Sequence, residues 1–93
     1  MLYKIKGVLY VGKKEKLIER LLKKPKDFTF EEMVTLLLYF GYEQKQGGTG
    51  SGVEFIKNGS NEEINFHRPH PNGILKSYII NQIIDKLRKD GLV

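Results

Sequence analysis

Apolar side chains recur three or four positions apart in three stretches of the chain, residues 13–24, 29–40 and 75–89. Such spacing places them on one face of a helix, so the pattern predicts three amphipathic helices. Pro25 closes the first, because the residue before a proline avoids the helical conformation. Its narrow apolar stripe consists of Leu17, Ile18, Leu21 and Leu22, with lysines on both sides.

The second helix has the clearest boundaries. Thr29 is followed three residues later by Glu32, the spacing of a capping box, and Gly41 stands where a left-handed residue closes a helix. We expect its buried face to contain Met33, Leu36, Leu37 and Phe40, widened by Val34 and Leu38. In the last helix we expect core positions at Leu75, Ile79, Ile80, Ile83, Ile84 and Leu87.

Between these two helices the pattern changes to the alternation that is typical of strands. Residues 53–57 and 63–67 alternate apolar and polar positions, and Asn58-Gly59 between them favours a tight hairpin. Residues 42–46 form a shorter and more polar strand candidate. The body is therefore predicted as α-β-β-β-α with one basic helix before it. Residues 1–12 alternate weakly, and both an added strand and an N-terminal leader fit them.

The composition narrows the possible functions. A chain of 93 residues fits one domain, and the absence of cysteine excludes disulfides, zinc thiolates, iron–sulfur clusters and cysteine nucleophiles. It also favours a reducing compartment, the cytosol. No apolar run approaches the roughly 20 residues of a membrane span, so we expect no membrane partner. No His/Asp/Glu cluster has the spacing of metal ligands, so no metal site is predicted.

The charge is concentrated near the N-terminus. The net charge is +5, but residues 1–26 hold nine basic and two acidic side chains, a local charge of +7, and the remainder carries −2. A basic lobe on a nearly neutral body indicates a polyanionic partner, with nucleic acid first. Surface lysine is also ordinary solubilising charge, and charge alone does not decide between the two interpretations.

Several short motifs resemble the HicA family of bacterial toxins from type II toxin–antitoxin pairs. The resemblance covers residues 29–90 and rests on the order of elements and on these residues: Phe40-Gly41-Tyr42-Glu43, Gly50, Ser51, Phe55, His70-Pro71 and Leu75-Lys76. It implies an α+β fold like that of double-stranded-RNA-binding domains, with a three-stranded antiparallel sheet. Here that fold has an additional N-terminal helix, as in a longer subgroup. We expect residues 13–93 to form one HicA-like domain and leave the status of residues 1–12 open.

The resemblance also implies a function. A toxin of this family binds and cleaves mRNA as a metal-independent endoribonuclease, is neutralised by a HicB-type antitoxin, and works in the bacterial cytoplasm without a small-molecule cofactor. Many members carry a histidine, taken as catalytic, directly after the Gly-Ser pair. This sequence has Gly52 there. Either another histidine replaces it, or the chain is a non-catalytic RNA-binding module, or a protein-interaction domain that docks an acidic partner.

The residues themselves suggest where chemistry would lie. Metal-free RNA cleavage needs a base for the 2′-hydroxyl, an acid for the leaving 5′-oxygen and a cation near the phosphate, and histidine suits the first two roles. The chain has two histidines, His67 and His70, and Arg68 and Lys76 lie within the same ten residues. His70 is the better match to the family's histidine-proline pair. Alternatively, both histidines serve only to end a strand and to fix a turn.

The remaining candidates are phosphate contacts. Residues 47–52 contain four glycines, whose backbone N–H groups can approach phosphate, although composition alone favours a flexible hairpin loop. The resemblance favours an RNA-facing loop formed by Gly50, Ser51 and Gly52. Six lysines of the basic lobe are further candidates, each weak alone and sensitive to salt: Lys13, Lys14, Lys16, Lys23, Lys24 and Lys26. The same lysines equally fit an acidic antitoxin surface.

Overall fold

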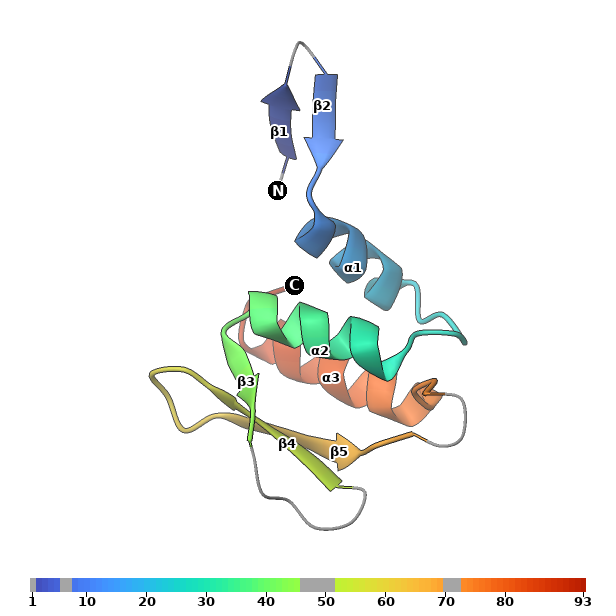
Figure 1. Ribbon diagram of the computed structural model, residues 1–93, viewed down its shortest axis with the longest axis vertical. Coiled ribbons are helices and arrows are strands. Elements are labelled where there is room, and N and C mark those ends of the chain that lie inside the picture. The colour runs from blue at the N-terminus through green and yellow to red at the C-terminus, as the bar shows by residue number, and fades with distance from the viewer. Residues whose placement is uncertain (1, 6–7, 46–51, 70–72) are drawn as a thin grey trace.

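Two antiparallel sheets and three helices make up the residues that the computed structural model describes, which are 2–5, 8–45, 52–69 and 73–93. In chain order the elements are β1 (Leu2–Ile5), β2 (Val8–Val11), α1 (Lys13–Leu22), α2 (Phe30–Tyr39), β3 (Tyr42–Gln44), β4 (Gly52–Lys57), β5 (Glu63–His67) and α3 (Ser77–Lys89). From α2 to α3 the order is the predicted α-β-β-β-α, and α1 precedes it (Figure 1). The fold class is α+β, with the layout of a double-stranded-RNA-binding domain.

The three-stranded sheet has the order β3-β4-β5, with both pairs antiparallel. Helices α2 and α3 lie on one face of it (Figure 1). Residues 53 and 55 of β4 and residues 64 and 66 of β5 are buried on that face, as the alternation predicts. The turn between these strands contains Gly59 at a φ of +78°, which a residue without a side chain adopts without strain.

One continuous core joins all three helices to the sheet. Its fully buried members include Leu21 of α1, so the extra helix contributes to the same core as the predicted α-β-β-β-α body. The predicted apolar faces are largely confirmed; the buried residues are Leu21, Phe28, Met33, Leu36, Leu37, Phe40, Tyr42, Val53, Phe55, Ile64, Phe66, Leu75, Ile79, Ile80, Ile83, Ile84 and Leu87. Leu38 is the exception, because 54% of it is exposed on the outward side of α2. Its predicted place in the buried face was wrong.

Two helix ends differ from the prediction. Helix α1 ends at Leu22 and Lys23 caps it, because Lys24 adopts a left-handed conformation with a φ of +51° just before Pro25. Helix α3 begins at Ser77 and not at residue 75, because the preceding residues pair with another segment. Ile74 bridges to Thr29, and the backbone N–H of Leu75 donates to the carbonyl oxygen of Phe28 at 2.8 Å.

Residues 2–5 and 8–11 form a separate two-stranded antiparallel sheet. Of the two interpretations that the sequence left open, the strand is therefore observed, in the form of a hairpin. This hairpin projects away from the helices, at the end of the molecule opposite the three-stranded sheet (Figure 1). A division of the chain into a leader of residues 1–12 and a domain of residues 13–93 stays a prediction.

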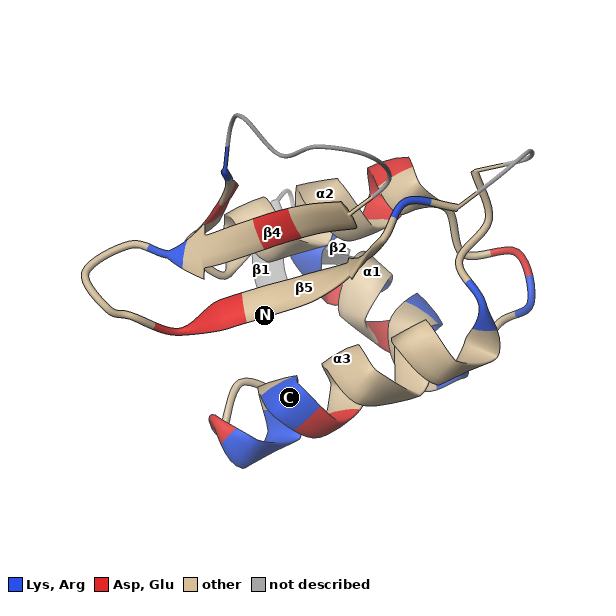
Figure 2. Cartoon of the chain, turned by 90° about the horizontal axis from the view of Figure 1, so that it is seen from below, with Lys and Arg blue, Asp and Glu red and all other residues tan. Residues whose placement is uncertain are grey.

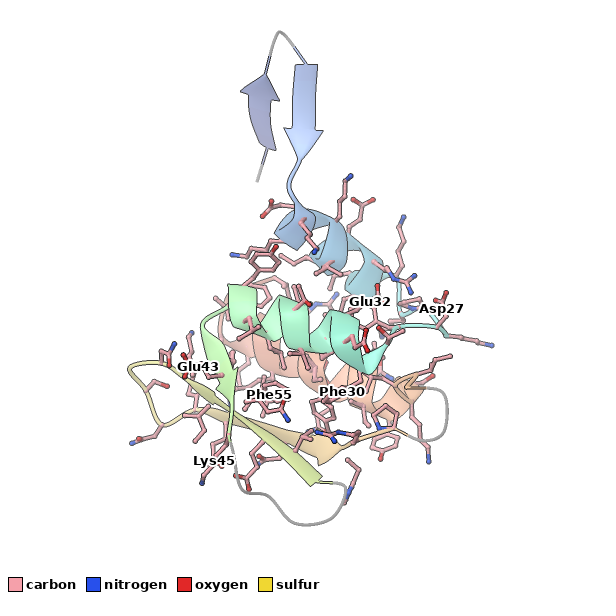
Figure 3. The ribbon with its side chains drawn as sticks, viewed as in Figure 1. Asp27, Phe30, Glu32, Glu43, Lys45 and Phe55 are labelled. Carbon is pink, nitrogen blue, oxygen red and sulfur yellow. The ribbon has the colours of Figure 1, made fainter. Side chains whose placement is uncertain are left out.

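A cluster of charged side chains fixes α1 against the start of α2, and we call it the Arg20 clamp. Arg20 donates from Nε to the Glu32 carboxylate at 2.8 Å, and from a terminal nitrogen to the backbone oxygen of Asp27 at 3.0 Å and its carboxylate at 3.1 Å. Glu32 also completes the predicted capping box with Thr29. Figure 3 shows Asp27 and Glu32 at this junction. The sequence predicts the box, but not the arginine that binds it.

The clamp predicts a specific pH dependence. The hydrogen bond from Arg20 holds the pKa of the Glu32 carboxyl below its ordinary value of 4.5. The ionised carboxylate therefore contributes stability that is complete above pH 4.5 and is lost as the pH falls through the lowered pKa. Glu32→Gln is expected to lower the free energy of unfolding at pH 7 by about 1 kcal/mol, and this difference should narrow on acidification.

Urea unfolding at pH 7 and at several acidic pH values measures both effects. Glu31→Gln is the matched control, since Glu31 lies in the same first turn and is exposed, with no side-chain bond among the described residues. The role assigned to the clamp would be contradicted if both variants lost the same free energy of unfolding. It would also be contradicted if the difference between Glu32→Gln and the wild type grew as the pH fell.

Candidate nucleic-acid interface

The strand register brings the position of the missing histidine next to one of the two histidines present. Gly52 is the first residue of β4 and pairs directly with His67, the last residue of β5. Both are exposed, on the face of the sheet opposite the helices. In an antiparallel sheet, side chains at directly paired positions point to the same face with Cβ atoms about 5 Å apart. An imidazole on His67 therefore occupies the neighbourhood that a side chain at position 52 would fill.

Nothing in the described structure requires a glycine at position 52. A Cβ atom built there would have no heavy atom within 4 Å, and the backbone is in the ordinary extended region. A Cβ atom thus fits at this place without a clash with the described residues. Gly52 is therefore not required by its backbone conformation or by its described neighbours.

Arg68 is held next to this strand end by aromatic rings. Its guanidinium lies 5.2 Å from the centre of the Phe30 ring, a cation–π distance. Phe30 packs edge-on against Phe66 at 6.0 Å, and Phe66 stacks on Phe55 at 5.7 Å. Figure 3 shows Phe30 and Phe55 between α2 and the sheet. A partly buried ring packed against the core therefore holds the exposed arginine where β5 ends and α2 begins.

Lys76 is positioned at the same end of the molecule by the connector before α3. The backbone N–H of Phe30 donates to the oxygen of Gly73 at 2.7 Å, which holds this connector against the start of α2. Lys76 is the exposed N-cap residue of α3, without a side-chain cap, and the first turn of α3 has no acidic residue. The positive end of the helix dipole adds to the charge of the lysine there.

The end of α1 supplies two more cations. Lys23 and Lys24 are both exposed, and among the described residues the partner of Lys23 is Glu19, in a surface ion pair at 3.5 Å. The left-handed backbone of Lys24 costs a residue with a side chain about 1 kcal/mol relative to glycine. A lysine kept in such a conformation at the surface is a reason to look for a function of its charge.

Acidic side chains lie on the outer face of all three strands of the sheet. Glu43, Glu54 and Glu63 are exposed there, one on each strand, and Lys45 pairs with Glu54 at 3.6 Å. Figure 2 shows acidic segments along β4 and β5, whereas basic segments appear where β5 ends, at the start of α3 and in the loop between α1 and α2. Basic segments also appear in the last turn of α3, so the cations near the end of β5 are one of several basic groups on the surface. The acidic side chains on the strands repel an anionic chain from the outer sheet face.

Three of the predicted site residues, His70, Gly50 and Ser51, lie outside the described residues, so the structure assigns them no position. Of the others, His67, Gly52, Arg68 and Lys76 belong to one end of the sheet and helices. Within the described ranges, no group of three His, Asp or Glu side chains could hold a metal ion, and no helix is long and apolar enough to cross a membrane. Phe30, whose ring contacts the Arg68 guanidinium, was not predicted as a site residue. An aromatic residue at the start of a helix does not by itself indicate that a distant arginine packs on it.

Comparison with known proteins agrees with this architecture. The fold is that of a small α+β protein with a double-stranded-RNA-binding-like layout. A family model described as the HicA toxin of bacterial toxin-antitoxin matches residues 30–92, about two-thirds of the chain, so the chain belongs to the HicA toxin family. The predicted family is confirmed, and with it a toxin role and an antitoxin as partner. No curated relative and no solved structure matches the chain.

The backbone of Lys24 yields a prediction about stability. Lys24→Gly removes the steric cost of the left-handed conformation, and is expected to raise the free energy of unfolding by about 0.5–1 kcal/mol. Lys26→Gly is the matched control: Lys26 is an exposed lysine of the same loop with an ordinary φ, and a glycine there should give no gain. Thermal and urea unfolding measure both variants. A loss of stability in Lys24→Gly would contradict the strain argument.

Proposed function

We propose that this toxin-family protein binds mRNA at the end of the sheet formed by Gly52 and His67, and cleaves it without a metal ion. The observation that carries the proposal is the register pair of these two residues, because it offers an imidazole beside the place where many family members have their histidine. We further propose that the protein is neutralised by a HicB-type antitoxin and acts in the bacterial cytoplasm.

The proposed reaction is an internal transfer at phosphorus. One histidine, of His67 and His70, takes the proton of a ribose 2′-hydroxyl, and the 2′-oxygen attacks the adjacent phosphorus. The bond to the 5′-oxygen breaks, and the second histidine donates a proton to that oxygen as it leaves. The products are a 2′,3′-cyclic phosphate and a free 5′-hydroxyl, so the protein regains its protonation state after one further proton exchange with water. Histidine suits both roles because its ordinary pKa lies near neutrality.

Binding is proposed to depend on the cations around this strand end. Arg68 presents a planar guanidinium that is suited to two phosphate oxygens, and Lys76 adds a point charge at the start of α3. Lys23 and Lys24 extend the basic surface toward α1. The loop residues Gly50, Ser51 and Gly52 are proposed to contact phosphate through backbone N–H groups and the serine hydroxyl. These contacts read the sugar-phosphate chain and not the base edges, so sequence preference is expected to be low.

The cleavage proposal predicts a rate loss. Purified protein should cut a long RNA in the presence of EDTA, and His67→Ala should lower the initial rate about 100-fold or more, as expected for the loss of a general acid or base. His70→Ala should give a loss of similar size. The measurement is fragment formation on a denaturing gel, with circular dichroism to show that each variant is folded. Intact RNA with the wild-type protein would support the non-catalytic RNA-binding module instead.

A second-site variant tests the geometry more sharply than a loss of activity. In the His67→Ala background, Gly52→His restores an imidazole on the paired strand, and part of the lost cleavage rate should return. Asn65→His is the matched control, because Asn65 lies on the same face of β5 but pairs with Glu54, one outward position farther along. Rescue by both histidines, or by neither, would count against a site located at the pair of Gly52 and His67.

RNA binding can be measured separately with the His67→Ala protein. Arg68→Gln and Lys76→Gln should each weaken binding several-fold and reduce the slope of log K against log salt by about 1, as expected for one lost phosphate contact. Lys89→Gln is the matched control, an exposed lysine at the opposite end of α3. If Lys89→Gln weakens binding as much as the other two, the cations act through net charge and no local site is needed.

A further inference from the structure

The N-terminal hairpin lacks the polar face that a strand pair in water normally has. Seven of the eight residues in β1 and β2 are apolar or aromatic, and Lys4 is the exception. The register pairs Tyr3 with Tyr10 and Ile5 with Val8, and these alternate with the pairs Leu2–Val11 and Lys4–Leu9. Because directly paired residues share a face and faces alternate along a strand, both faces of the hairpin are assigned mostly apolar residues.

Such a hairpin is poorly suited to stand alone. Strands with apolar residues on both faces are typical of sheets covered on both sides, and an isolated two-stranded hairpin is marginally stable in water. Among the described residues no third strand pairs with β1 or β2, so both outer edges offer unpaired backbone groups. The hairpin also precedes the part of the chain that matches the HicA family, residues 30–92. Its sequence therefore lies outside both the family match and the proposed RNA site.

The charges beside the hairpin indicate the kind of partner. Helix α1 begins directly after it, and Lys13 and Lys16 are exposed there without an ion pair to any described residue. Lys14 lies over the Phe40 ring at 4.9 Å. A second copy of this chain on the hairpin would bring the same lysines together, whereas an acidic protein would neutralise them. RNA would gain little from the apolar residues, because it is recognised through phosphates and 2′-hydroxyls.

We propose that the hairpin and the first turn of α1, residues 2–5, 8–11 and 13–16, form a docking arm for the antitoxin. A strand of the antitoxin adds to an edge of the hairpin, and carboxylates next to that strand meet Lys13 and Lys16. The arm lies at the opposite end of the molecule from the proposed RNA site, along a longest extent of 49 Å (Figure 1). The antitoxin thus has a contact surface on the toxin that does not include the residues proposed for cleavage. The inference rests on membership of the toxin family and not on RNA cleavage.

The test uses the full chain and the antitoxin that is encoded with it, purified separately and combined in a calorimetric titration. Leu9→Asp with Tyr10→Asp places one charge on each face of the hairpin, and should weaken binding at least tenfold. Lys13→Glu with Lys16→Glu should weaken it too, by a factor that shrinks as salt is raised. Arg88→Glu with Lys89→Glu, at the end of α3, is the matched control and should change affinity less than twofold.

Each alternative occupant gives its own result. Unchanged antitoxin affinity in both arm variants would overturn the proposal. Analytical ultracentrifugation of the chain alone tests whether a second copy of the chain occupies the arm. If the chain self-associates, if Leu9→Asp with Tyr10→Asp abolishes this self-association, and if antitoxin affinity stays unchanged, the arm forms a dimer contact and the proposal is wrong. The hairpin variant should bind RNA with unchanged affinity. A loss of RNA affinity as large as the loss of antitoxin affinity would also overturn the proposal. If the hairpin variant does not fold, the antitoxin affinity of the variant Lys13→Glu with Lys16→Glu decides whether the proposal holds, because both lysines lie on the surface of α1.

Discussion

The Arg20 clamp is the interaction on which the placement of the candidate site depends. A single guanidinium binds the Glu32 carboxylate, the backbone of Asp27 and the face of the Phe28 ring. Phe28 is fully buried, and its carbonyl oxygen accepts from Leu75, the residue before Lys76. The end of α1, the start of α2 and the start of α3 are therefore linked through a few bonds. The clamp therefore helps to position Lys23 and Lys24 at the end of α1 and Lys76 at the start of α3.

The division of charge over the surface follows from this arrangement. The clamp uses two acids and one arginine internally, and it leaves Lys23, Lys24 and Lys76 exposed around it. The acids of the sheet lie on the strands, away from that end. Exposed charges contribute little to folding stability, since each surface pair is worth about 0–1 kcal/mol. Their distribution therefore has few consequences for the fold and larger consequences for where a polyanion can bind.

The sequence predicted those features whose cause is local. The capping box of Thr29 and Glu32, the left-handed Gly41 and the isoleucine face of α3 each depend on residues within one or two turns, and all are observed. Features that depend on distant partners were not predicted. The partner of Glu32 lies twelve residues away on another helix. Periodicity likewise could not show that Leu38 faces outward, because that depends on which neighbours pack on α2.

The register of β4 and β5 is the clearest example of such a distant feature, and it bears on how a missing motif residue is interpreted. In the sequence, Gly52 and His67 are unrelated positions, and the glycine suggests lost chemistry. In the sheet they are direct neighbours on one face. Proton transfer requires an imidazole within hydrogen-bond reach of the reacting oxygen, whatever strand carries it. A side chain about 5 Å away on the paired strand can meet that requirement. The absence of a histidine from its usual position is therefore compatible with a site whose imidazole comes from the adjacent strand.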